Sequence, residues 1–184
     1  MKATGIVRRI DDLGRVVIPK EIRRTMRIRE GDPLEIYTDR EGEVIFKKYS
    51  PIGELANFAG EYAETLHKVC GISVLIFDRD AVIATAGVGK REYQDRKMSE
   101  ELEEIAERRQ FYSRKNAADK IFPIMDNDSH YVSCAMPIIT GGDMIGCVCS
   151  VTTDEEQATP ALAYDSEAKL IQTAATFLSK QMEN

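Results

Sequence analysis

The first fifty residues show period-two alternation and short apolar runs, which are typical of β-strands. The pattern predicts one strand over residues 6–10 and a second, rich in β-branched residues, over residues 15–18, with turn chemistry at residues 11–14 between them. Two further apolar runs, 34–38 and 43–48, flank a polar turn and predict a hairpin. The N-terminal part of the chain is therefore expected to consist mainly of short strands.

A short helix with a basic stripe is predicted between these two pairs of strands. Pro19 suits the first turn of a helix, because an N–H group at that position has no partner within the helix. Lys20, Arg23, Arg24 and Arg27 follow at i, i+3, i+4 and i+7, which places them on one helical face. The helix therefore presents several cations in one direction.

After this region the apolar residues change to helical spacing and to longer strand-like runs. The spacing predicts long helices over residues 53–69 and 165–182, and a shorter helix over residues 100–109 with Ser99 as its N-cap. Strands are predicted at residues 71–78, 81–86, 120–124, 131–139 and 144–151. This order of elements predicts an α+β fold in which helices pack on an antiparallel sheet.

The change of pattern predicts two domains, residues 1–50 and residues 56–184, joined by a linker at residues 51–55 that contains helix breakers. Fifty residues of short strands bury little apolar surface alone. We therefore expect the N-terminal domain to form an intertwined homodimer around one shared, barrel-like core. If the two long helices also pair across subunits, a tetramer results, so that both a dimer and a tetramer stay open.

The charge of the chain is divided unequally along its length. Residues 1–29 contain nine basic and three acidic residues, a net charge of +6, whereas the whole chain carries −6 at pH 7. Residues 30–184 therefore carry −12. A basic segment in an acidic chain favours a polyanionic partner for that segment alone. Screening limits the influence of the acidic part to about 10 Å at 0.1 M salt.

Residues 14–24, Gly-Arg-Val-Val-Ile-Pro-Lys-Glu-Ile-Arg-Arg, resemble the signature of the AbrB-type swapped-hairpin transcription factors. The resemblance covers about the first fifty residues and implies a dimeric swapped-hairpin barrel that binds double-stranded DNA, with a preference for A·T-rich, bendable sites. It also implies that six basic side chains form the DNA-binding site. These are Arg8, Arg15, Arg23 and Arg24, with Arg9 and Lys20 as their neighbours.

The chemistry of these side chains agrees with a DNA site, because guanidinium groups bind phosphate oxygens bidentately and reach guanine edges. The alternative is that the helical stripe is only a solvated surface, as most charge runs are. Arg8, Arg9 and Arg15 lie on the flanking predicted strands, outside the helix. A merely solvated surface would usually carry more acidic residues to balance them, so we favour DNA binding.

The C-terminal domain resembles a GAF domain, a small-molecule sensing module of bacterial regulators, most closely at residues 137–148. The resemblance implies a small-molecule effector, whose binding residues are unknown. The Asn-Lys-Phe-Asp-Glu type signature of cyclic-nucleotide-binding members is missing from the sequence, which argues against a cyclic nucleotide. Together the two domains resemble regulators of spore-forming bacteria, and this implies activation and repression of sporulation-phase genes.

The four cysteines, Cys70, Cys134, Cys147 and Cys149, have no paired-ligand spacing, and we expect them to be free, buried thiols. Cys147 and Cys149 are two residues apart on a predicted strand and should face the same side. A redox or ligand-converting GAF-fold enzyme therefore stays an alternative. No catalytic, cofactor or metal-binding motif can be assembled from the sequence, so we predict a non-enzymatic protein with no cofactor and no metal.

Two further alternatives are weighed against DNA regulation. An antitoxin-type protein binds a toxin through a tail, but the C-terminal half has the pattern of a folded domain and not of a disordered tail. A purely structural oligomer does not explain the arginine cluster. No apolar run approaches the length needed to span a bilayer, and no signal-peptide pattern opens the chain, so we expect a cytoplasmic protein without a membrane partner.

Overall fold

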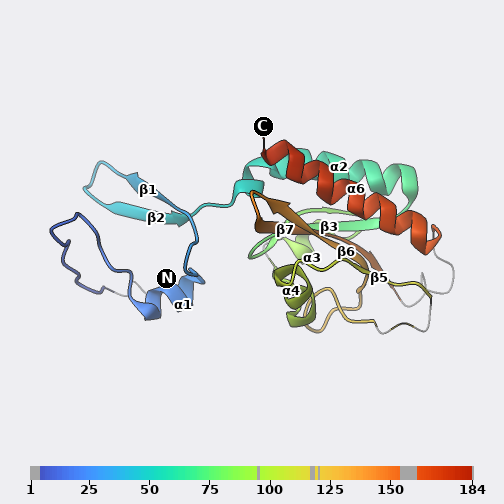
Figure 1. Ribbon diagram of the computed structural model, residues 1–184, viewed down its shortest axis with the longest axis horizontal. Helices are drawn as coiled ribbons and strands as arrows, with labels where there is room; N and C mark the ends of the chain where they lie inside the picture. Colours follow the sequence, from blue (N-terminus) through green and yellow to red (C-terminus); the bar gives the residue numbers. More distant parts are fainter. Residues whose placement is uncertain (1–4, 95, 117–118, 120, 154–160, 184) are drawn as a thin grey trace. The chain divides into compact units, whose positions relative to one another are not determined.

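The computed structural model describes residues 5–94, 96–116, 119, 121–153 and 161–183. The chain forms two compact units (Figure 1), which we call the first unit, Met1–Tyr49, and the second unit, Ser50–Asn184.

The first unit contains a helix and a hairpin. Helix α1 (Lys20–Met26) starts after Pro19, as predicted. It ends at Arg27, whose backbone adopts a left-handed conformation with φ 52°. Strand β1 (Leu34–Thr38) pairs antiparallel with β2 (Val44–Lys48), so the predicted hairpin is confirmed.

Residues 6–10 and 15–18, predicted as strands, are irregular in the structure. The two segments are joined by a turn that is closed by a hydrogen bond from the Asp11 N–H to the Arg15 C=O (2.9 Å). Their apolar side chains are exposed except for the half-buried Ile18, and Val7 reaches 93%. The prediction of two strands is wrong for the single chain. A strand forms only when a neighbouring strand pairs with it through backbone hydrogen bonds, and the described residues contain no such neighbour for these segments.

The second unit is built on a five-stranded antiparallel sheet with the strand order β4-β3-β7-β6-β5. Its strands are β3 (Ser73–Asp78), β4 (Val82–Ala86), β5 (Tyr112–Ser113), β6 (Tyr131–Thr140) and β7 (Asp143–Thr152). The tight turn between β6 and β7 requires positive φ at Gly141 (58°) and Gly142 (87°), a conformation that glycine adopts without strain. The predicted α+β class with an antiparallel sheet is confirmed.

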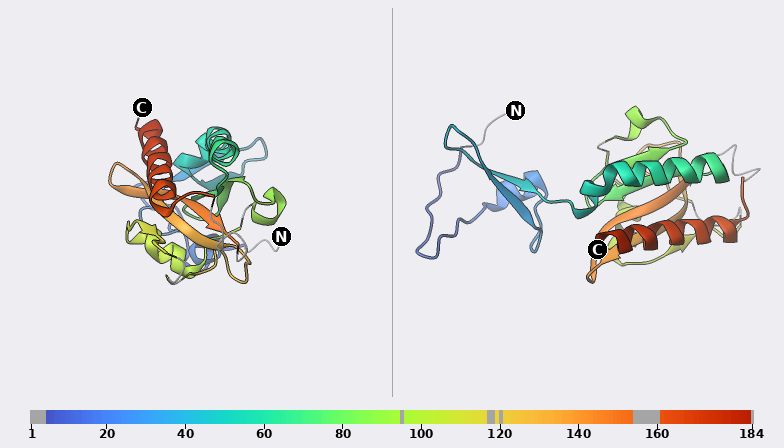
Figure 2. Two further views of the ribbon diagram at one scale, coloured as in Figure 1. Left: turned by 90° about the vertical axis from the view of Figure 1, so that its right-hand side faces the viewer. Right: turned by 90° about the horizontal axis from the view of Figure 1, so that it is seen from above.

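Helices cover both faces of this sheet (Figures 1 and 2). Helices α2 (Ala56–Cys70) and α6 (Tyr164–Met182) lie side by side on one face, and α4 (Glu100–Glu107) lies on the other. Ser99 caps α4 as predicted, because its Oγ accepts a hydrogen bond from the Leu102 N–H (3.4 Å).

Three short segments differ from the predicted pattern. Residues 121–124 are not a strand, and Pro123 forms only an isolated bridge with Tyr131, while Lys120 lies outside the described residues. Proline lacks the N–H that a ladder requires, which explains why pairing stops there. Strand β5 and helix α3 (Lys90–Tyr93) were not predicted, because segments this short show no periodicity.

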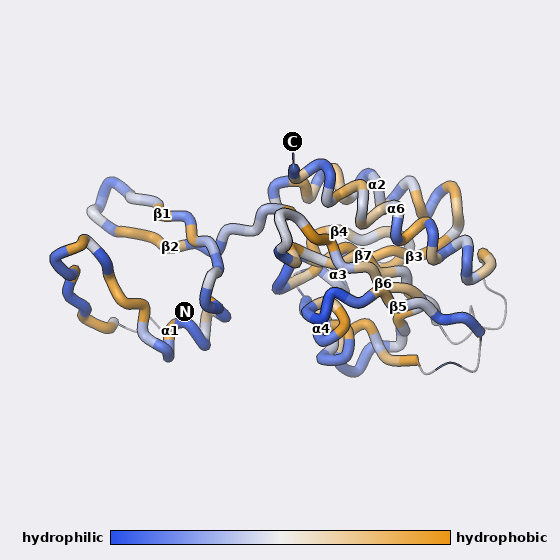
Figure 3. Tube along the Cα trace, viewed as in Figure 1, coloured by the Kyte–Doolittle hydropathy of each residue, from blue (hydrophilic) through white to orange (hydrophobic). Residues whose placement is uncertain are grey.

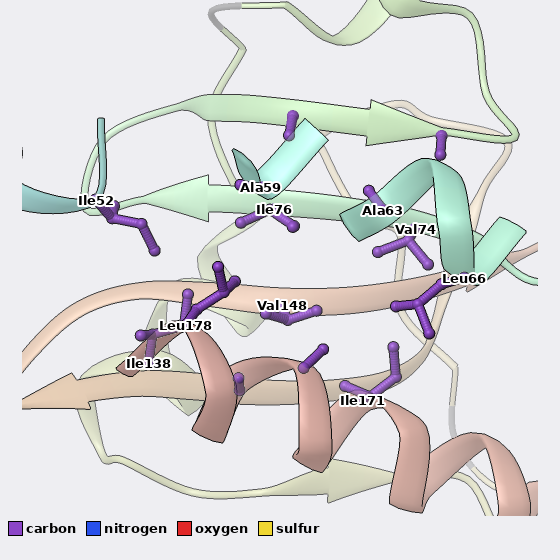
Figure 4. Packing of buried hydrophobic residues seen from close by; sticks show 14 of the residues in the cluster. Ile52, Ala59, Ala63, Leu66, Val74, Ile76, Ile138, Val148, Ile171 and Leu178 are labelled. Atoms are coloured by element: carbon purple, nitrogen blue, oxygen red, sulfur yellow. The ribbon is translucent and has the colours of Figure 1, made fainter. Parts of the chain in front are cut away.

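The alternation of side chains along the strands creates two cores, one on each face of the sheet. Val74 and Ile76 of β3 face α2 and α6, whereas Leu75 and Phe77 face α4. Figure 4 shows the core under α2 and α6. Its labelled residues are Ile52, Ala59, Ala63, Leu66, Val74, Ile76, Ile138, Val148, Ile171 and Leu178.

Residues 51–55, predicted as a linker, form the 3-10 helix η1 (Pro51–Leu55) and belong to the second unit. Ile52 is completely buried in the core of Figure 4. Ser50 fixes the start of η1: its Oγ accepts from the Gly53 N–H (3.2 Å) and donates to Asp78 Oδ2 (2.9 Å). The segment is packed because burying the isoleucine side chain is favourable.

Candidate nucleic-acid interface

The six predicted DNA-binding side chains all lie in the first unit and are all exposed. Arg8 and Arg9 lie on the irregular segment before the turn, and Arg15 follows the turn directly. Helix α1 carries the other three, which are Lys20, Arg23 and Arg24. Arg27, predicted to extend the helical stripe, instead occupies the left-handed cap position after the helix, because α1 ends one residue earlier.

The end of α1 is anchored to the hairpin by a small polar cluster. Lys48 Nζ donates to the Arg27 C=O (2.9 Å) and lies 3.3 Å from Asp32 Oδ2. Asp32 Oδ2 also accepts from the Arg29 N–H (2.8 Å), and its side chain is only 3% exposed. The helix is thereby attached to β2, so its basic side chains project from a fixed support.

Most of the candidate side chains are free to bind a ligand. Arg8, Arg9, Lys20, Arg23 and Arg24 form no ion pair with the residues that the structure describes. A solvated surface whose charges serve only its own stability would pair them with nearby carboxylates. The unpaired cations therefore leave their hydrogen-bond donors available to an anion.

Arg15 has a different environment, because its Nε donates to Asp11 Oδ2 at 2.8 Å. Asp11 Oδ1 accepts from the backbone N–H groups of Leu13 (3.0 Å) and Arg15 (2.8 Å). The hydrogen bond from the Arg15 backbone, followed by the bond from its side chain, lowers the pKa of the Asp11 carboxyl below its ordinary value. The sequence indicates only turn chemistry at Asp11, and its ion pair with Arg15 was not predicted, although opposite charges four residues apart were a signal for it.

The first unit exposes many large apolar side chains. Figure 3 shows the hydrophobic stretches of the chain to which they belong. Soluble monomers seldom leave so many large apolar side chains in water. The exposed ones are Ile6, Val7, Ile10, Leu13, Val16, Val17, Met26, Ile36, Tyr37, Val44, Ile45 and Phe46.

All four thiols were predicted to be buried; Cys134, Cys147 and Cys149 are, whereas Cys70 at the end of α2 is only half-buried. Cys147 and Cys149 face the same side of β7 with their Sγ atoms 3.5 Å apart, whereas Cys134 belongs to the opposite core. Burial raises the pKa of Cys134 and of Cys149, so these thiols stay protonated and unreactive at neutral pH. Within the described ranges, His, Cys, Asp and Glu side chains do not gather in a group that could hold a metal ion.

A polar cluster that was not predicted joins α3 to the loop before β6. The Tyr93 hydroxyl donates to Asp128 Oδ1 (2.9 Å) and lies 2.7 Å from His130 Nδ1. Burial, followed by the hydrogen bond to Asp128, raises the pKa of Tyr93 well above its ordinary value. The tyrosine is 2% exposed, so the cluster acts as a buried connection between segments.

Comparison with known proteins assigns the family. A family model described as stage V sporulation protein T C-terminal, transcription factor, matches residues 54–183. Stage V sporulation protein T of Bacillus subtilis (strain 168) is 51% identical over 184 residues, which cover 100% of this chain and 99% of the relative. The chain belongs to the stage V sporulation protein T family. This membership confirms the prediction of a transcription regulator and not an enzyme.

The N-terminal region matches further proteins. A family model described as antidote-toxin recognition MazE, bacterial antitoxin, matches residues 7–53. Transition state regulatory protein AbrB of Bacillus subtilis (strain 168) is 52% identical over 71 residues, which cover 39% of this chain and 72% of the relative. The predicted AbrB-type domain is therefore confirmed, and the match with the sporulation family over the whole chain disfavours the antitoxin alternative.

The second unit was also compared with solved structures. A GAF domain/HD domain protein from Geobacter sulfurreducens is 16% identical with a TM-score of 0.47, over 74% of this chain and 98% of that one. A likeness at this level says nothing about a ligand. Each helix in the described part of the chain is too short or too polar to traverse a lipid bilayer.

Proposed function

We propose that this transcription regulator binds duplex DNA through the first unit, while the second unit assembles the chains and responds to a small-molecule effector. The DNA-binding side chains of this proposal are Arg8, Arg9, Arg15, Lys20, Arg23 and Arg24. We further propose that the protein acts in the cytoplasm and both activates and represses sporulation-phase genes.

The observation that carries the proposal is the set of exposed cations without ionic partners in a segment of net charge +6. Each guanidinium presents a planar fork of N–H donors that matches phosphate oxygens. Residues 30–184 carry −12, so duplex DNA is attracted to residues 1–29 and repelled by the acidic remainder of the chain.

The exposed apolar side chains of the first unit support an intertwined homodimer. A second copy would cover them and would supply the strand partners that residues 6–10 and 15–18 lack among the described residues. Two-fold symmetry then doubles the basic set and suits two half-sites on a duplex.

An aromatic surface on the second unit supports a tetramer. Phe177 of α6 is 37% exposed and packs against Phe58 (5.7 Å between ring centroids) and Tyr62 (5.5 Å) of α2. In the proposal these outer helices pair across subunits, so that two DNA-binding dimers join into one particle. Light-scattering mass of the full-length protein checks this step: four chains are expected, and a mass of two chains would exclude the tetramer.

The proposed effector acts on the second unit. A hollow of about 260 Å³ lies between η1, β4 and α3, and Gly53, Ile83, Lys90 and Gln94 are among its lining residues. Its volume suits a small molecule only. Such a molecule changes DNA binding only if it binds one conformation of the second unit better than another. A thermal-shift screen of small metabolites tests this part, with a Lys90→Ala variant as its control.

The experiment that tests DNA binding is a salt series with full-length protein and an A·T-rich duplex. Six to eight phosphate contacts per dimer predict a slope of log K against log salt of about −5 to −7. Changing Arg8, Arg15, Arg23 and Arg24 to alanine should abolish binding and flatten the slope.

The matched control removes the same number of charges from exposed basic residues of the second unit, namely Arg91, Arg96, Lys97 and Lys169. This control should bind like the wild type. Equal loss in both variants, or no binding by the wild type, would refute the proposal. A G·C-rich duplex of the same length tests the proposed preference for A·T-rich sites, and equal affinity would remove that preference.

A further inference from the structure

The turn before Arg15 holds a carboxylate in a fixed orientation. Asp11 Oδ1 accepts two backbone N–H groups, from Leu13 (3.0 Å) and Arg15 (2.8 Å). The Gly14 N–H donates to the Asp11 C=O (3.0 Å), and Gly14 has a φ of 75°, which closes the turn. These bonds fix the direction of Oδ2 independently of the Arg15 side chain, because their donors are backbone groups.

The fixed carboxylate then engages one edge of the Arg15 guanidinium. Asp11 Oδ2 accepts from Arg15 Nε at 2.8 Å. A guanidinium has five N–H donors, of which Nε carries one. The other four, on the two Nη atoms, form no bond with the described residues, and the Arg15 side chain is 69% exposed. Asp11 therefore holds the Arg15 side chain at Nε, while the N–H groups of the two Nη atoms stay available to a ligand.

We propose that Asp11 is a positioning residue for DNA binding, which orients Arg15 so that the two Nη atoms face a phosphate or a guanine edge. The inference rests on the proposed function of the first unit. An arginine that is oriented before DNA binds loses less rotational freedom on binding. Exposed ion pairs contribute little to folding, so the bond serves orientation more than stability.

A carboxylate beside a DNA-binding arginine also repels phosphate, and the test must separate this repulsion from positioning. Asp12 provides the matched control, because it is the adjacent acidic residue, is exposed, and forms no side-chain hydrogen bond with the residues that the structure describes. Asp11→Asn and Asp12→Asn each remove one negative charge. Asp11→Asn keeps a side-chain oxygen for the backbone N–H groups, but the new amide nitrogen cannot accept from Arg15 Nε.

The experiment measures the affinity of full-length protein for a labelled A·T-rich duplex by fluorescence anisotropy, in the wild-type and Arg15→Ala backgrounds. Asp12→Asn should bind at least as tightly as the wild type. Asp11→Asn should bind more weakly than Asp12→Asn by about 2- to 5-fold per copy of the first unit, a factor that is squared in a dimer. In the Arg15→Ala background the two variants should bind equally.

Two outcomes overturn the inference and leave the proposed function intact. In the first, Asp11→Asn and Asp12→Asn have equal affinity for the duplex in the wild-type background, although Arg15→Ala weakens binding. In the second, Asp11→Asn has the lower affinity in both backgrounds, so its effect does not pass through Arg15. Absence of wild-type binding refutes the proposed function itself, and the inference falls with it. Far-UV circular dichroism of each variant checks that the first unit stays folded.

Discussion

Replacing Ile52 by alanine distinguishes a packed junction from a free linker. The side chain is 0% exposed and lies in the core between the sheet and the helices α2 and α6. A flexible linker would tolerate this substitution with a change in the free energy of unfolding of at most about 0.5 kcal/mol. In the packed structure, by contrast, Ile52→Ala removes side-chain contacts from the core of the second unit.

The size of the expected effect follows from burial. An Ile→Ala change in a closed core costs about 2–5 kcal/mol, the sum of lost burial and of the cavity that remains. Because Ile52 is completely buried, we expect about 3 kcal/mol. For a unit the size of residues 50–184, this corresponds to a fall in melting temperature of about 8–15 °C.

The assay is thermal unfolding of the full-length protein, followed by circular dichroism at the wavelength of helix absorption. Glu54→Ala is the matched control, because Glu54 lies on the same 3-10 helix and is exposed. The control should melt within about 2 °C of the wild type. If Ile52→Ala melted as close to the wild type as Glu54→Ala does, the packed junction would be wrong.

Three further predictions concern the thiols, Asp11 and Gly146. Cys134, Cys147 and Cys149 are buried, and burial raises the pKa of Cys134 and of Cys149. A thiol reagent at pH 8 should therefore modify Cys70 first and the three buried thiols only when the protein unfolds. The pKa of Asp11 is lowered, so its contribution to the turn should be complete above pH 3.8 and lost as the pH falls through the lower folded value; an NMR titration of the carboxyl should give a midpoint below 3.8. Gly146→Ala should destabilise the second unit by about 1–3 kcal/mol in a denaturant titration, because its Cβ would clash with a backbone oxygen of β3.

Each of these has a clear contrary result. Reaction of all four thiols at one rate in the folded protein would contradict the protected core and would favour the redox alternative. A midpoint at or above 3.8 for Asp11 would show that its hydrogen bonds are not formed in solution. For the glycine, Gly60→Ala on α2 is the control, because an added Cβ there meets no atom within 4 Å. An equal effect of both glycine substitutions would contradict the close approach of β3 and β7.

In the first unit, the sequence predicted the elements that depend only on residues close together in the chain, which are α1 and the β1–β2 hairpin. Pro19 and the basic run gave α1, and two apolar runs around a polar turn gave the hairpin. The strands at 6–10 and 15–18 have the correct pattern, but a strand forms only when a second strand completes its ladder. In a homodimer that partner is another chain, which a single sequence or a single chain does not supply.

In the second unit, the length of each helix or strand decided whether it could be predicted. Helices α2 and α6 and the long pair β6 and β7 span enough residues for their period to be clear. The two-residue strand β5 does not. The position of β3 between β4 and β7 could not be predicted either, because pairing between strands far apart in the chain depends on the packing of both faces.

At the candidate site, the sequence predicts which residue types are present but not how their side chains are placed. The six candidate basic residues were predicted from the sequence, since charge and resemblance depend on residue type alone, and the structure places all six on the surface. The bond between Asp11 and Arg15 depends on how the turn directs one carboxylate, which residue type does not show. The end of the helical stripe was also misjudged, because the left-handed backbone of Arg27 ends the helix before that residue.

The unequal charge of the two units limits how an effector can influence DNA binding. The acidic second unit does not attract the duplex, and salt at 0.1 M screens its field beyond about 10 Å. A mechanical route for an effect of the second unit is the covalent connection at Ser50. The Ser50 hydroxyl donates a hydrogen bond to Asp78 at the end of β3, and the buried Ile52 follows two residues later. A ligand that rearranged this core would move the point from which the first unit extends, whereas one that bound without moving it would leave DNA affinity unchanged.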